Sequence, residues 1–284
     1  MTALLNASGC LDALAAPEVA SELDAFVTKT VTPHPREGNP PPRFAELPGG
    51  MLNSIGLQNP GIDAFASEVL PRLRDLEIPL WVSVGGFSAH DYASVCERLE
   101  EREEVQTIEL NLSCPNVEEA PETAAELVGA ARTSTRKPLY AKLSPATWDV
   151  AESARAVEAA GADGISLVNT IRGLALDDAR RPVLGRGAGG YSGPALRPIA
   201  LACVAACAAA VDLPIVGMGG VSTGSDVLDL VAVGASAVAL GTVLFADPWA
   251  ARRIRSELRE AGVEAPEAPH AARPSVTAAV TTSN

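Results

Sequence analysis

The stretch LYAKLSPATWDVAESARAVEAAGADGISLV, Leu139–Val168, predicts a strand, a helix and a second strand. LYAKL (139–143) and GISLV (164–168) are short and mostly apolar, as expected of parallel strands that are buried on both faces. Between them, Ser144 is expected to cap a helix, Pro145 to occupy its first position and Gly161 to end it. Two parallel strands joined by a helix form the repeating unit of an α/β fold.

The same alternation continues along the chain. Strands are expected at 3–6, 25–29, 80–84, 107–112, 139–143, 164–168, 214–218 and 236–240. Further helices are expected within 61–76, 88–101, 121–134, 194–210, 222–234 and 246–261. This order predicts an α/β protein with a single domain, a (β/α)8 TIM barrel over residues 1–263, and a doubly wound open sheet is the alternative.

Two connections between these elements are long. Residues 30–60 are rich in proline and residues 169–193 are rich in glycine, so both are expected to be loops. Excursions of this length inside a compact domain usually bind ligands or cover a site. Residues 264–284 contain few bulky apolar side chains and are expected to form a disordered tail.

Composition narrows the classes of partner. The 284 residues carry a net charge of −13 without a basic stripe, which disfavours nucleic acid and anionic membranes as partners. The apolar run LACVAACAAAV (201–211) is too short to span a bilayer. Three scattered histidines lack the spacing of metal ligands, so no metal is expected. Five cysteines without a signal peptide indicate reduced thiols in a cytoplasmic protein, with Cys203 and Cys207 in the core.

Polar and small residues follow the expected strands, and the carboxyl ends of barrel strands are where catalytic residues lie. They are Ala7–Cys10, Lys29–Thr30, Gly85–Gly86, Asn111–Asn116, Lys142, Asn169–Thr170, Met218–Gly220 and Gly241–Thr242. A single glycine after a strand is most often only a turn. The set as a whole favours an active site.

Two features of this rim indicate a phosphorylated flavin. Glycine-rich ends of the last two strands, each followed by a helix, are typical of a phosphate site, and Ser192–Gly193 is expected to add a contact. Lys29 and Lys142 are expected to aim positive charge at an anionic ring or carboxylate, the alternative being lysines paired with acids. A reduced flavin carries negative charge near N1 that a cation stabilises.

In family order, these motifs resemble the class 1B-type (NAD-linked) catalytic subunits of dihydroorotate dehydrogenase. The matching strings are ASGC, GNPPPR, GMLNSIGLQNPG, ELNLSCPN, YAKLSP, EAAGADGISLVNT, GGYSGPALRP, PIVGMGGV and GASAVALGT. The resemblance spans about Ala7 to Gly262. It implies an enzyme that binds FMN at the rim of a barrel and oxidises dihydroorotate to orotate in de novo pyrimidine biosynthesis.

The resemblance also implies roles for individual residues. FMN would be bound by Ala7, Ser8, Lys29, Thr30, Asn111, Lys142, Val168, Gly193, Gly219, Gly220, Gly241 and Thr242. The substrate would be bound by Lys29, Asn53, Gly56, Leu57, Asn111, Asn116, Asn169 and Thr170. Cys114 matches the catalytic base, which removes the C5 proton while FMN accepts the C6 hydride.

Residue chemistry is consistent with these roles. A thiol with an ordinary pKa of about 8.5 can act as a base when it is partly ionised. Asparagine amides both donate and accept hydrogen bonds, which suits a pyrimidine ring that alternates N–H and C=O groups. Taken alone, Cys114 would more often be a half-buried structural thiol. Its place beside Asn111 and Asn116 at a strand end favours catalysis.

The segment NSIGLQNPG (53–61) resembles the NAD-linked type, in which an iron–sulfur flavoprotein subunit relays electrons from FMN. The chain lacks cysteine spacing for such a cluster, so the cluster is expected on the partner, within a heterotetramer. A homodimer is the alternative assembly.

Two features depart from the family pattern. The chain begins almost at its first strand, where relatives carry a segment that closes the barrel floor, so we expect exposed apolar surface or a late start site. The connection after Asn116 is short, and we expect it to cover the substrate less completely.

Two other functions stay open: a flavin oxidoreductase of another pyrimidine, such as a tRNA dihydrouridine synthase, and a flavin-binding relative with little turnover. The charge of −13 counts against the RNA enzyme.

Overall fold

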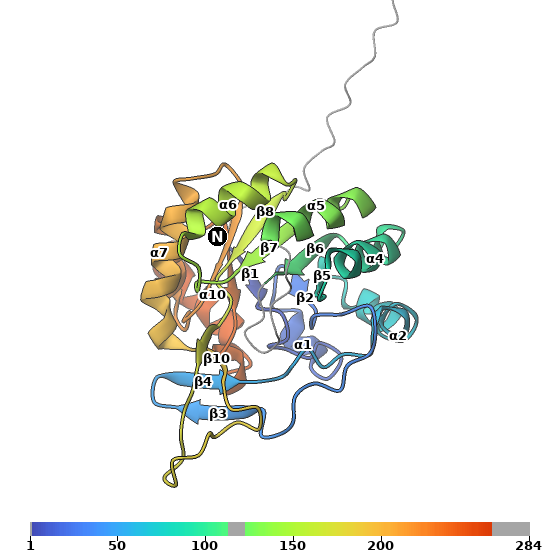
Figure 1. The fold of residues 1–284 in the computed structure, drawn as a ribbon. Coiled ribbons are helices and arrows are strands. Elements are labelled where there is room, and N and C mark those ends of the chain that lie inside the picture. Colours follow the sequence, from blue (N-terminus) through green and yellow to red (C-terminus); the bar gives the residue numbers. More distant parts are fainter. Residues whose placement is uncertain (1, 113–122, 263–284) are drawn as a thin grey trace, which may run out of the picture.

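The centre of the protein is a parallel sheet of eight strands. The computed structural model describes residues 2–112 and 123–262. The strands are β1 (Ala3–Asn6), β2 (Phe26–Val27), β5 (Leu80–Val84), β6 (Thr107–Asn111), β7 (Leu139–Leu143), β8 (Gly164–Leu167), β11 (Ile215–Met218) and β12 (Ala237–Leu240). Neighbours follow the order β1-β12-β11-β8-β7-β6-β5-β2, and a parallel bridge between Leu5 and Ala25 brings β1 and β2 together (Figure 1). The predicted barrel is therefore confirmed.

Each run expected as a strand contains one barrel strand, and LYAKL coincides with β7. The alternative, a doubly wound open sheet, is wrong because β1 lies between β12 and β2 instead of in the middle of a sheet with two free edges. The tail expected at 264–284 lies outside the described residues.

Helices surround the barrel and cover its outer face (Figure 1). They are α1 (Pro17–Ala20), α4 (Ala89–Glu100), α5 (Ala124–Ser134), α6 (Val150–Ala159), α7 (Arg197–Ala208), α8 (Gly224–Ala232), α9 (Val243–Ala246) and α10 (Ala250–Glu260). The helix expected within 61–76 is irregular, with α2 (Ile62–Ala64), a π-turn η1 (Phe65–Val69), α3 (Leu70–Leu73) and a 3₁₀ turn η2 (Arg74–Leu76). A further 3₁₀ turn, η3 (Pro194–Leu196), precedes α7. In the described ranges, no helix is long and apolar enough to cross a bilayer.

The cap expected for α6 is wrong. The helix begins at Val150, and Asp149 caps it by accepting hydrogen bonds from the N–H groups of Ala151 (2.9 Å) and Glu152 (3.0 Å). Ser144 accepts instead from the N–H of Ala146, within the turn before the helix. A carboxylate that accepts two N–H bonds at the positive end of a helix is the stronger cap.

Apolar residues divide between two regions. Alternate residues of β6, Ile108 and Leu110, face the helices and are fully buried there. The barrel interior is filled by a small cluster with Leu5 and Val216 among its members, against which the rings of Trp81 and Tyr140 pack 4.5 Å apart. The remaining interior positions, nearer the carboxyl ends of the strands, are free to hold polar side chains. Cys203 and Cys207 of α7 are buried, as predicted.

The two long connections contain a second sheet, which sequence analysis missed. Its strands β3 (Phe44–Leu47), β4 (Gly50–Asn53), β10 (Gly189–Ser192) and β9 (Ile171–Gly173) are antiparallel and adjacent in that order. β3, β4 and β10 lie together at one end of the barrel (Figure 1). The contact between Asn53 and Gly190 joins residues 137 positions apart. Local sequence carries no signal for such a pairing, and the glycines of β10 suggest a loop.

Candidate active site

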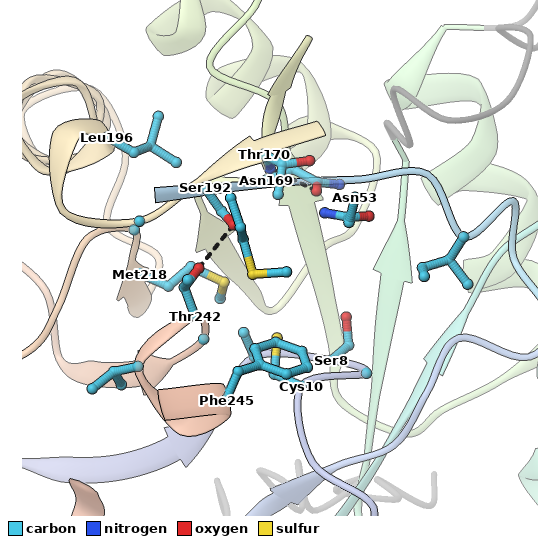
Figure 2. A pocket seen from close by; sticks show the side chains of 18 of the residues that line it. Ser8, Cys10, Asn53, Asn169, Thr170, Ser192, Leu196, Met218, Thr242 and Phe245 are labelled. Atoms are coloured by element: carbon cyan, nitrogen blue, oxygen red, sulfur yellow. Dashed lines mark hydrogen bonds between the residues drawn. The ribbon is translucent and has the colours of Figure 1, made fainter. Parts of the chain in front are cut away.

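A cavity of about 580 Å³ opens at the carboxyl ends of the barrel strands, against the second sheet (Figure 2). Every predicted site residue that the structure describes lines it: Ala7, Ser8, Lys29, Thr30, Asn53, Gly56, Leu57, Asn111, Lys142, Val168, Asn169, Thr170, Gly193, Gly219, Gly220, Gly241 and Thr242. Cys114 and Asn116 lie outside the described residues. The structure thus gathers the predicted residues around one space, and their individual roles stay predictions.

Lys142 of β7 supplies a buried cation to this cavity. Its ammonium donates to Ser8 Oγ (3.0 Å) and lies 3.4 Å from the carboxylate of Glu109 on β6. The side chains of Lys142 and Glu109 are 6% and 2% exposed, so water screens the pair only weakly. The second predicted cation, Lys29, lies beside Gly9, because a Cβ at Gly9 would be 3.1 Å from Lys29 Nζ.

Amide and hydroxyl groups form a continuous network on one wall. Asn169 donates to Asn111 Oδ1 (3.0 Å), and Asn111 donates to Thr30 Oγ1 (3.2 Å). Thr30 in turn shares a hydrogen bond of 3.0 Å with Ser83. Among the described residues, these bonds use one N–H and one lone pair of the Asn111 amide, which has two of each. The network therefore orients an amide that can still pair with a ligand.

Glycine turns form the opposite wall. Gly193, Gly219 and Gly220 have φ values of +121°, +119° and +76°, which side chains rarely adopt. A Cβ at Gly193 would lie 2.5 Å from Gly50 Cα, and one at Gly220 would lie 2.7 Å from the backbone nitrogen of Arg197. Only glycine therefore lets these cavity-lining turns pack this closely against the backbone of Gly50 and Arg197.

The sequence suggests that the start of α8 takes part in a phosphate site, but the structure gives two of its backbone amides another partner. The N–H groups of Ser222 (2.8 Å) and Thr223 (2.9 Å) donate to the carboxylate of Asp226, which also pairs with Arg197. These amides are therefore occupied by the protein itself. On this wall the residues that line the cavity are Gly219, Gly220, Val221 and Ser222, which precede the first helical residue of α8, Gly224.

The family model for dihydroorotate dehydrogenase matches residues 2–261. The chain belongs to the dihydroorotate dehydrogenase family. It is 45% identical over 246 residues to the protein named dihydroorotate dehydrogenase B (NAD(+)), catalytic subunit, of Listeria monocytogenes strain HCC23, a match that covers 84% of this chain and 81% of that protein. The protein of the same name from Geobacillus kaustophilus is 44% identical, with 84% and 79% covered. The predicted resemblance is confirmed, and with it the expectation of an enzyme family.

Solved structures of this family share the fold. The crystal structure of DHODH from Eimeria tenella in complex with ferulenol superposes with a TM-score of 0.76 at 23% identity, covering 92% of this chain and 82% of that one.

Within the part of the chain that the structure describes, no group of three or more His, Cys, Asp or Glu residues could hold a metal ion.

Beyond the residues predicted from family motifs, other side chains line the cavity. Cys10 follows β1, in a motif that the sequence already exposed, whereas Phe44 and Phe245 carried no signal. The two phenylalanine rings lie 6.0 Å apart and are about half exposed, at 49% and 51%. Thr242 donates to Ser192 Oγ at 2.8 Å across the same region (Figure 2). This bond ties the end of β12 to the second sheet.

Cys10 is a second candidate for the general base, a role predicted for Cys114. Burial raises the pKa of the Cys10 thiol above its ordinary value, although Lys142 and Lys29 act to lower it. The thiol therefore stays protonated at neutral pH, which makes Cys10 a poor general base.

Proposed function

We propose that the chain oxidises dihydroorotate to orotate in de novo pyrimidine biosynthesis, with FMN as its cofactor. The observation that carries this proposal is the composition of the cavity at the barrel rim. It combines two lysines, a network of amides and glycine turns, which are the groups that an anionic pyrimidine and a flavin phosphate require.

The residues present fit FMN. The cavity of about 580 Å³ is of the size of cofactor sites in general. The turns at Gly193, Gly219–Gly220 and Gly241 offer close backbone approach for the phosphate, and Lys142 offers positive charge for the ring. When bound, the flavin supplies an acceptor for the hydride that leaves the substrate.

The network of amide and hydroxyl groups on one wall of the cavity would orient the substrate. Asn111 and Asn169, together with Asn53 from β4 and Thr170, offer donors and acceptors to the ring of dihydroorotate. Lys29 would pair with the carboxylate of the substrate. Because Asn111 is held by Asn169 and Thr30, its amide is already oriented before the substrate arrives.

We assign the proton transfer to Cys114, on the resemblance of ELNLSCPN to the family motif. The base removes the C5 proton while the hydride leaves C6. Burial disfavours Cys10 for this task because it raises the pKa of that thiol.

We further propose an electron-transferring partner, an iron–sulfur flavoprotein subunit that passes electrons to NAD+ within a heterotetramer. Support comes from the relatives in Listeria monocytogenes and Trichlorobacter lovleyi, which are named catalytic subunits of an NAD(+)-linked enzyme. A cytoplasmic location remains part of this proposal.

The test is the absorption spectrum of the purified protein under anaerobic conditions, before and after dihydroorotate is added. The parent protein is expected to be yellow and to bleach. Cys114→Ala is expected to keep FMN but to bleach at least a hundredfold more slowly, the usual contribution of a general base. Cys10→Ala is the matched control and should bleach at nearly the parent rate.

Two results would contradict the proposal. A yellow protein that dihydroorotate does not bleach would remove the proposed reaction and leave flavin binding. Unchanged bleaching in Cys114→Ala, together with slow bleaching in Cys10→Ala, would transfer the role of base to Cys10.

A further inference from the structure

A carboxylate lies buried beneath the cavity, and nothing in the reaction above uses it. Glu109 sits in the middle of β6 with 1% of its surface exposed. It does not line the cavity, whereas its partner Lys142 does. Glu109 therefore occupies the layer directly below the predicted flavin site and contacts that site through Lys142.

Stability does not explain the presence of this carboxylate. A buried ion pair gains little over well-packed apolar side chains because both charges lose their hydration. The separation of 3.4 Å is also long for a charge-assisted hydrogen bond. Among the described residues, Lys142 is the cation that Glu109 contacts. A buried charge that adds little stability and contacts a residue of the cavity suggests a role in that cavity.

The geometry of Lys142 indicates what that role is. Its ammonium is held between Ser8, which lines the cavity, and Glu109 below. With Glu109 charged, the groups Lys29, Lys142 and Glu109 together contribute one net positive charge to this region; without it they contribute two. All three charges also act on the pKa of the Cys10 thiol, after the larger effect of burial, so they share one electrostatic environment.

We propose that Glu109 is a positioning residue that holds the ammonium of Lys142 against Ser8, offsets its charge, and thereby lowers the reduction potential of FMN bound in the cavity. This inference rests on the proposed function, because it requires FMN. A reduced flavin carries negative charge near N1, which an uncompensated cation would stabilise. A carboxylate behind the cation weakens that stabilisation and makes the reduced flavin a better donor of electrons to the next carrier.

The decisive measurement is the midpoint potential of bound FMN, titrated anaerobically with a reference dye and without dihydroorotate. Glu109→Gln keeps the shape of the side chain and removes its charge. At the midpoint potential of the parent, its ratio of reduced to oxidised FMN is expected to be at least tenfold higher, a positive shift of about 30 mV for a two-electron couple. Glu109→Asp should return most of the way to the parent value. Glu152→Gln, on the exposed face of α6, is the matched control without a shift.

A double-mutant cycle tests whether Glu109 acts through Lys142. In Lys142→Gln the ammonium that Glu109 would position is absent. Adding Glu109→Gln in that background should therefore shift the potential by much less than it does in the parent. An equal shift in both backgrounds would show that Glu109 acts independently of Lys142 and would overturn the positioning role.

Loss of FMN from a variant does not hide the result. The ratio of dissociation constants for oxidised and reduced FMN must change by the same tenfold factor as the potential, and it can be measured by titrating the apoprotein. A change below twofold, or a change in the opposite direction, overturns the inference. A parent that keeps FMN but ignores dihydroorotate would contradict the proposed function and leave this test intact; a parent that binds no FMN would overturn both.

Discussion

Replacement of Gly241 by alanine separates ligand binding from folding. Gly241 follows β12 and lines the cavity, and a Cβ there would lie 3.5 Å from Ala7 Cβ and 3.8 Å from Cys10 Sγ. These are ordinary van der Waals distances, so we expect the free energy of unfolding to change by no more than about 0.5 kcal/mol. The methyl group nevertheless stands on the cavity wall, where backbone is expected to approach the FMN phosphate.

The expected loss is in affinity for FMN. One extra methyl group in a well-packed contact costs about 1–3 kcal/mol, which corresponds to a dissociation constant raised about fivefold to 150-fold. The assay is titration of the FMN-free protein with FMN, followed by quenching of flavin fluorescence, alongside urea unfolding of the same FMN-free samples. Unfolding without FMN is needed because a bound ligand adds its own stabilisation.

Alanine substitutions at two other glycines serve as controls for stability and for FMN affinity. Gly220→Ala places Cβ 2.7 Å from the backbone nitrogen of Arg197 at a φ of +76°, so it should lose about 2–4 kcal/mol of stability as well as affinity. Gly129→Ala lies in α5 with no atom within 4 Å of the new Cβ and should gain about 1 kcal/mol without affecting FMN. If Gly241→Ala bound FMN as tightly as Gly129→Ala, the assignment of this turn to the phosphate would be refuted.

Three further predictions concern Asn6, Glu257 and Cys10. Asn6 is fully buried, accepts from the N–H of Val27 (2.8 Å) and donates to its C=O (2.7 Å), so Asn6→Leu should lower the free energy of urea unfolding by about 2–5 kcal/mol; a loss below 1 kcal/mol would contradict this. The N–H of Gly224 lowers the pKa of Glu257 below its ordinary 4.5, so Glu257→Gln should be less stable by about 1 kcal/mol at pH 7; this difference should begin to shrink as the pH falls towards 4.5 and vanish only below the lowered pKa. Burial raises the pKa of Cys10, so its alkylation in FMN-free protein, read by peptide mass spectrometry, should be slow at neutral pH and still rising above about pH 9.

Much of the lining of the candidate active site could be predicted because barrel architecture converts sequence order into spatial proximity. Once the strands are recognised, residues that directly follow them must meet at one rim. Ser8, Asn111, Lys142 and Gly241 come from different strands, yet they line one cavity for this reason. The roles of Cys114 and Asn116 rest on resemblance to the family.

Other parts of the site depended on contacts between distant segments. Glu109 reads in the sequence as one polar residue in an apolar strand, and only the register of β6 against β7 places it behind Lys142. The second sheet pairs β4 with β10, and its residues Asn53 and Ser192 reach the cavity from across the chain. The two hydrogen bonds between the Asn6 side chain and the backbone of Val27 likewise form only when the barrel closes.

Local sequence patterns were enough to define the alternation of strands and helices, and hence the barrel, because hydrophobic periodicity records which face of each element is buried. They also defined the rim, since glycine, lysine and asparagine stand directly after the strands. Tertiary structure alone decided which cap begins α6, where Asp149 replaced Ser144, and how the two long connections pair. It also decided which carboxylate lies beneath Lys142. Competition between possible caps, pairing across 137 residues and burial of a charge are settled by the closed fold as a whole, and no local pattern records them.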